Sequence, residues 1–67
     1  MLAMDARSVC LEVMRIVTSR HPTPVATHII YKELGVDSRH RLTQRQIKFL
    51  VEKGYLKRFP KYKVGLK

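Results

Sequence analysis

The chain has 67 residues, of which 14 are Lys or Arg and 5 are Asp or Glu, giving a formal net charge of +9. A chain of this length forms one domain, residues 1–67, and buries roughly 60% of its unfolded surface, so a deep substrate cavity is not expected. No apolar run approaches the roughly 18 residues of a membrane span. The single cysteine, Cys10, excludes an intramolecular disulfide. We therefore expect a soluble, cytoplasmic domain with no secretory signal and no contact with membranes.

A first helix is predicted from about residue 6 to Arg20. Asp5 is a suitable N-cap, because its carboxylate can accept backbone N–H bonds that the first turn leaves unsatisfied. Pro22 ends the helix, since its ring disfavours helical geometry at the preceding residue. One buried face is predicted from the i, i+3, i+4, i+7 spacing; it consists of Cys10, Val13, Met14 and Val17, with Val9 and Ile16 beside them.

A second helix is predicted to start at Thr23-Pro24, where an N-cap hydroxyl precedes a proline at the first helical position. Gly35 is a natural end for this helix, because glycine adopts the left-handed conformation without steric cost. The apolar side of the helix is marked by Val25, Ile29, Ile30 and Leu34.

A third helix has two alternative starts. Either Asp37 or Ser38 caps it early, or Thr43 and Gln46 form a later capping box. The helix ends at Lys53-Gly54 in both cases. Its apolar face is formed by Ile47, Leu50 and Val51. Its outer side carries Gln44, Arg45, Lys48 and Glu52.

The last 13 residues change from a helical period to the alternation of a half-buried strand. The stretch Phe59-Pro60-Lys61-Tyr62 contains a turn signal, with proline at the second position, and predicts a short basic hairpin. Its register stays open, because such proline turns suit tight two-residue hairpins poorly. We expect Tyr55 or Tyr62 in the core, and a place for Phe59 at the hairpin tip stays open. The alternative is that these aromatic rings stack on the bases of a single-stranded nucleic acid.

The net charge lies in the last 29 residues. Residues 1–38 contain four basic and four acidic residues. After Ser38, only Glu52 opposes ten basic residues, which are Arg39, Arg41, Arg45, Lys48, Lys53, Lys57, Arg58, Lys61, Lys63 and Lys67. Such a localised positive field attracts polyanions, of which nucleic acid is the commonest in cells. Lysine that served only solubility would be mixed with acidic residues throughout the chain.

The third helix runs straight into a strand through the motif Ile47-x-x-Leu50-Val51-x-x-Gly54-Tyr55-Leu56. With three helices followed by a basic hairpin, nearly the whole chain resembles the winged helix-turn-helix family, in particular compact regulators of archaeal, viral, plasmid or phage type. The resemblance implies a mainly α fold with a small β-hairpin, and a transcription regulator. It implies that the third helix enters the major groove of double-stranded DNA while the hairpin, or wing, touches the backbone. The segment 35–43 is longer than the turn of a compact helix-turn-helix.

The predicted nucleic-acid-binding residues lie before the third helix, on its outer side and in the wing. Their side chains can donate hydrogen bonds to base edges or to phosphates. The N-terminus of the third helix also favours phosphate, through its free N–H groups and its dipole. The set is Arg39, Arg41, Thr43, Gln44, Arg45, Lys48, Lys57, Arg58, Lys61 and Lys63.

Two other functions are alternatives to DNA binding. A winged helix that binds RNA or the ribosome satisfies the charge argument equally well, and a protein-interaction module could use the same surface on an acidic partner. A homodimer would extend the footprint on DNA, and positions around Leu2 and Val9 are candidates for its contact. We expect no enzyme, no small-molecule ligand and no cofactor. We also expect no metal, because the three histidines and Cys10 lack a close ligand spacing.

Overall fold

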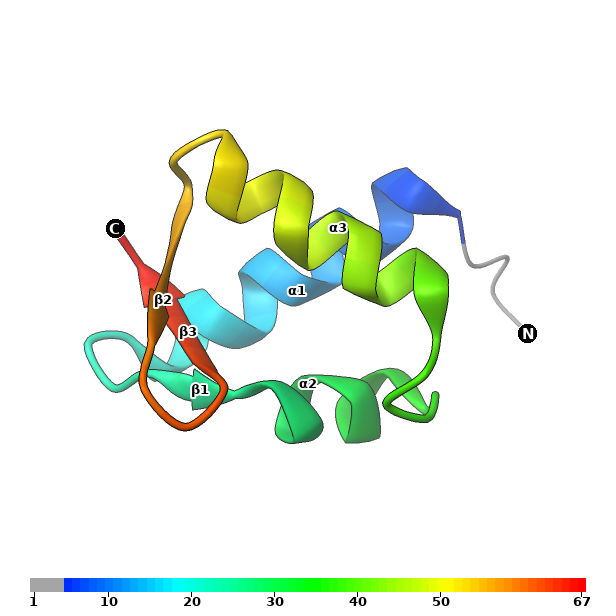
Figure 1. The fold of residues 1–67 in the computed structure, drawn as a ribbon, viewed down its shortest axis with the longest axis horizontal. Coiled ribbons are helices and arrows are strands. Elements are labelled where there is room, and N and C mark those ends of the chain that lie inside the picture. Colours follow the sequence, from blue (N-terminus) through cyan, green and yellow to red (C-terminus); the bar gives the residue numbers. More distant parts are fainter. Residues whose placement is uncertain (1–4) are drawn as a thin grey trace.

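The computed structural model describes residues 5–67, in which three helices pack together and a three-stranded antiparallel sheet lies at one end of them (Figure 1). The helices are α1 (Ala6–Arg20), α2 (Thr27–Leu34) and α3 (Arg41–Glu52). The strands are β1 (Val25–Ala26), β2 (Leu56–Phe59) and β3 (Lys63–Leu66), in the sheet order β1-β3-β2. The predicted mainly α fold, with three helices before a C-terminal hairpin, is therefore confirmed.

α1 begins and ends where the sequence predicts. The carboxylate of Asp5 accepts a hydrogen bond from the Ser8 N–H at 2.8 Å, and this bond holds the pKa of Asp5 below its usual value. Cys10 and Met14 are only partly buried, so the buried face is centred further round the helix than the spacing predicts. The residues that it buries are Val9, Val13, Ile16 and Val17.

The predicted start of α2 is wrong. Thr23-Pro24 does not open a helix; the next two residues form β1, and α2 begins at Thr27 without a side-chain cap. The cause is tertiary pairing, because Val25 lies opposite Val64 of β3 and the following residue lies opposite Lys63. A cap seen locally in the sequence is thereby overridden by a strand partner almost forty residues away.

The end of α2 and the start of α3 are set by local geometry. Gly35 has a φ of 73°, the left-handed conformation that the sequence predicts for it. α3 begins at Arg41, between its two predicted starts, because His40 is the N-cap. The His40 Nδ1 atom accepts the Thr43 N–H at 3.3 Å and lies 2.8 Å from Thr43 Oγ1. Neither Asp37 nor Ser38 caps α3, and Thr43 sits inside its first turn.

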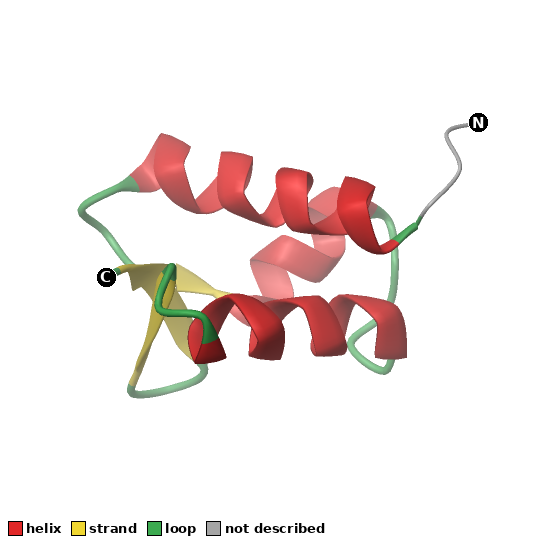
Figure 2. Ribbon diagram, turned by 90° about the horizontal axis from the view of Figure 1, so that it is seen from above, coloured by secondary structure: helices red, strands yellow, loops and turns green. Residues whose placement is uncertain are grey.

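The hydrophobic core lies between the helices and the sheet. α1 and α3 run side by side in Figure 2 and pack against each other, while α2 lies behind them. Ile47, Leu50 and Leu56 belong to one buried cluster, which confirms the predicted packing where α3 meets β2. The buried core residues are Val9, Val13, Ile16, Val17, Val25, Ile30, Ile47, Leu50, Leu56 and Val64.

The aromatic residues of the hairpin are placed differently from the prediction. Tyr55 is 58% exposed and Tyr62 is 86% exposed, so neither fills the core. Tyr62 belongs to the turn between β2 and β3, where it and Lys61 have positive φ angles of 59° and 63°. Phe59 does not project from the hairpin tip, because its ring covers Gly65: a Cβ atom there would lie 3.1 Å from Phe59 Cε2.

Candidate nucleic-acid interface

The outer side of α3 presents a stripe of basic side chains. Arg41, Arg45 and Lys48 are exposed and follow the i, i+4, i+7 spacing, so they share one face of the helix. The opposite face is buried through Thr43, Ile47 and Leu50. Because the helix starts at Arg41, this residue is part of the stripe and not of the preceding loop.

Nine of the ten predicted binding residues are exposed, and Thr43 is the exception. Its side chain is fully buried and lies against His40, so the expectation that it contacts a phosphate is wrong. Gln44 is exposed, but its Nε2 donates to the Ser38 carbonyl at 2.8 Å and ties the preceding loop to α3. Arg39 is exposed in that loop. The exposed basic side chains of the hairpin are Lys57, Arg58, Lys61 and Lys63.

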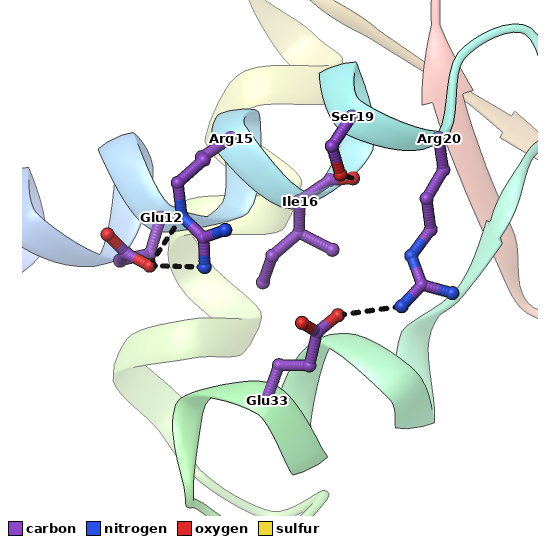
Figure 3. A network of polar contacts seen from close by, with 6 residues as sticks. All are labelled: Glu12, Arg15, Ile16, Ser19, Arg20 and Glu33. Atoms are coloured by element: carbon purple, nitrogen blue, oxygen red, sulfur yellow. Dashed lines mark hydrogen bonds and ion pairs between the residues drawn. The ribbon is translucent and has the colours of Figure 1, made fainter.

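In the described structure, basic side chains form ion pairs in the first part of the chain but not in the second. In α1, Arg15 contacts Glu12 at 2.8 Å, and Arg20 bridges to Glu33 of α2 at 3.1 Å (Figure 3). Within residues 5–67, these are the ion pairs that form, and neither uses a cation after Ser38. The positive charge on α3 and the hairpin therefore faces solvent without a carboxylate partner.

A hollow of about 200 Å³ joins α3 to the hairpin and to the start of α2. Burial raises the pKa of the Tyr31 hydroxyl, an effect that the nearby Arg58 charge opposes, so this hydroxyl keeps its proton at neutral pH and can donate a hydrogen bond. α3 contributes Gln44 and Ile47 to this hollow, which therefore lies on the flank of the helix beside the basic stripe and not under it. Its lining residues are Thr27, Tyr31, Gln44, Ile47, Arg58 and Tyr62.

Four of these lining residues are not predicted from the sequence as members of the site, namely Thr27, Tyr31, Ile47 and Tyr62, and of these Ile47 is predicted correctly for the core. Thr27 and Tyr31 share a face of α2 by their i, i+4 spacing, and they join the site only through the tertiary packing of α2 beside α3 and the hairpin. The expectation that Tyr62 lies in the core is wrong because β3 begins one residue later, at Lys63, and Tyr62 belongs to the preceding turn. The pattern Thr27-x-x-x-Tyr31 is the available signal, but it does not show that this face of α2 lies beside α3 and the hairpin.

The predicted dimer contact is not supported at Val9, which is buried in the core. Leu2 lies outside the described residues. The exposed large apolar side chain of α1 is instead Leu11, which is 61% exposed.

Among residues 5–67, no three His, Cys, Asp or Glu side chains are grouped so that they could hold a metal ion. The Cys10 thiol donates to Gln46 Oε1 at 3.1 Å, and burial raises its pKa, which keeps it in the unreactive protonated form. None of the described helices has the length and apolar character needed to cross a membrane.

No family model, curated protein or solved structure matches this chain significantly.

Proposed function

We propose that the protein is a winged helix-turn-helix domain that binds double-stranded DNA and regulates transcription. In this proposal α3 enters the major groove and the hairpin between β2 and β3 acts as the wing on the flanking backbone. The observation that carries it is the concentration of unpaired cations on α3 and the hairpin, with Glu52 as the only acidic residue of that region. A surface of this kind supplies the phosphate attraction on which DNA binding depends.

The shape of α3 supports contact with bases. An α-helix fits the major groove of B-form DNA, which is about 12 Å wide and presents a distinct pattern of donors and acceptors for each base pair. The core holds one face of α3, so Arg45 and Lys48 on the opposite face are free to reach a groove. Arginine can bind guanine through two hydrogen bonds, which makes Arg45 the best candidate for reading a base.

The hairpin supports a different kind of contact. Its exposed basic side chains are mostly Lys, whose compact charge suits phosphate better than the planar edge of a base. A short hairpin beside a helix that occupies the groove meets mainly the backbone. We therefore assign Lys57, Lys61 and Lys63 to phosphate contacts, which fix the position of the domain without reading its sequence.

Duplex DNA is favoured over duplex RNA by the geometry of the helix. A-form RNA has a deep, narrow major groove that protein side chains cannot read, and its sequence-specific recognition uses mostly single-stranded regions. A surface whose main feature is a projecting basic helix is therefore better suited to B-form DNA.

The experiment compares duplex DNA, duplex RNA and single-stranded DNA of one sequence by fluorescence anisotropy at about 100 mM salt, where the Debye length is about 10 Å. Tightest binding to duplex DNA, and recovery of a preferred site from a random duplex pool, are expected. Binding to RNA that equals or exceeds binding to DNA would favour the RNA-binding alternative. No binding to any of the three would favour a protein-interaction module.

A further inference from the structure

We propose that the hollow between α3 and the hairpin seats one unpaired nucleobase, so that the protein prefers duplex DNA with an unpaired base to the fully paired duplex. The inference rests on the proposed function, because the hollow adjoins the surface assigned to duplex binding. It adds a further class of target, duplex DNA with an unpaired base. The basic residues of α3 and of the hairpin do not by themselves imply this target.

The lining of the hollow has the chemistry of a base-binding site. The rings of Tyr31 and Tyr62 and the guanidinium of Arg58 are flat groups on which an unpaired base can stack. Gln44 brings an amide whose Oε1 can accept a hydrogen bond from a base edge while its Nε2 donates to the Ser38 carbonyl, and Ile47 provides an apolar floor. The lining contains a single formal charge, that of Arg58, so it is less suited to a phosphate than the lysine-rich hairpin beside it.

The size of the hollow fits one base. A cavity of about 150 Å³ is large enough to hold a benzene molecule. A hollow of about 200 Å³ that is open to solvent can therefore accept a single heterocyclic base at its mouth, whereas a base pair is too large for it. The protonated hydroxyl of Tyr31 offers a further donor to a ring nitrogen or carbonyl of that base.

Tyr62 is held at the rim of the hollow by the backbone. Its carbonyl accepts the Thr27 N–H at 2.9 Å, which joins the turn to the start of α2. Tyr62 and Lys61 both adopt positive φ angles, which non-glycine residues rarely do and which cost free energy. In this turn the side chain of Tyr62 is 86% exposed and lines the hollow. It can therefore cover a base that is bound there.

The test uses three duplexes of one sequence: a fully paired one, one with a single bulged adenine, and one with an abasic bulge that keeps the backbone but lacks the base. The adenine bulge should bind the wild-type protein about fivefold or more tightly than either of the others, which is the lower end of the effect of stacking one base on an aromatic ring. Equal affinity for the adenine and abasic bulges would overturn the inference, because the base itself would then contribute nothing.

Two variants test whether the preference for the adenine bulge depends on the hollow. Tyr62→Ala should reduce the ratio of affinities between adenine bulge and abasic bulge to about one, while Tyr62→Phe, which keeps the ring, should retain it. The matched control is Tyr55→Ala, which removes another exposed tyrosine ring outside the hollow and should leave the ratio unchanged. A ratio that survives Tyr62→Ala, or that is abolished equally in Tyr55→Ala, would contradict the assignment.

A base analogue gives a direct readout. Fluorescent 2-aminopurine placed in the bulge should be quenched when the wild-type protein binds, because stacking on a ring quenches it, and should be quenched less by the Tyr62→Ala variant. If the paired duplex binds but no bulge is preferred or quenched, the inference fails and the proposed function stands. If no duplex binds at low salt, both fail.

Discussion

Residues 5–38 and residues 39–67 use charged side chains in opposite ways. The first region has four basic and four acidic residues, and two of its cations form ion pairs, including the Arg20–Glu33 bridge between α1 and α2. The second region has ten basic residues and Glu52, and none of these cations has a carboxylate partner in the described structure. Exposed ion pairs contribute little to stability. The main effect of the difference is therefore that the first region has no net charge and the second has a strongly positive electrostatic potential.

The same comparison separates stability from binding within α3. One face of this helix is packed in the core through Ile47 and Leu50, and the other carries Arg41, Arg45 and Lys48 in solvent. Substitutions on the buried face should therefore change the free energy of unfolding, whereas substitutions on the basic face should change the affinity for DNA.

The largest effect is expected for Leu50→Ala on the buried face of α3. Leu50 is 5% exposed, so its truncation leaves a cavity and should lower the free energy of unfolding by about 2–5 kcal/mol. That is a large part of the stability of a small domain. Denaturant unfolding measures the change, and Lys48→Ala on the opposite face serves as the control. An unchanged unfolding midpoint for Leu50→Ala would mean that this face is not the core.

A smaller effect, on binding and not on folding, is expected for Arg45→Ala. Removal of the guanidinium that reads a base should weaken binding to the preferred site by about 1–3 kcal/mol and relax discrimination at one base position. Titration of the preferred duplex and of single-base variants measures both quantities. The control is Arg15→Ala, whose cation is paired with Glu12 and lies in the balanced region. Equal weakening on all sequences would show that α3 does not read bases.

His40→Ala should destabilise the start of α3 by about 1 kcal/mol, the usual cost of removing an N-cap acceptor. The His40→Asn variant keeps a side chain that can accept the Thr43 N–H and should recover most of this stability. Thermal unfolding with hydrogen exchange at the first turn of α3 measures the effect. Unchanged exchange in His40→Ala would mean that the imidazole does not cap the helix.

The smallest effects are expected for Lys61→Ala and Lys63→Ala in the hairpin. Each should weaken binding to all duplex sequences alike and make the slope of log K against log salt shallower by about one unit for each phosphate that is no longer neutralised. Anisotropy titrations at several salt concentrations measure the slope. A sequence-dependent weakening would assign these lysines to the bases instead of the backbone.

The parts of the structure that the sequence predicts correctly depend on neighbours in the chain. Asp5 and Ser8 cap α1 within one turn, Gly35 ends α2 through its own φ angle, and the apolar spacing of Ile47 and Leu50 locates the core face of α3. The exposure of Arg41, Arg45 and Lys48 follows from the same spacing, because side chains opposite a buried stripe must face solvent.

The parts that the sequence predicts wrongly depend on residues far apart in the chain. Nothing near Val25 indicates that it pairs with Val64, so neither β1 nor the true start of α2 can be predicted locally. The start of α3 is a local exception, because His40, three residues before Thr43, takes the cap role that the sequence assigns to Thr43, and Thr43 is buried instead. The hollow cannot be predicted from the sequence either, because α2, α3 and the hairpin come together to form it only in the folded chain.

The most direct test of the central claim is the salt dependence of duplex DNA binding by the wild-type protein. If the unpaired cations of α3 and the hairpin neutralise about four to six phosphates, the slope of log K against log salt should be roughly −4 to −5. The Arg15→Ala variant, which alters the balanced region, should show the same slope. A slope near zero, or no binding at low salt, would contradict the claim that this positive surface is a DNA-binding surface.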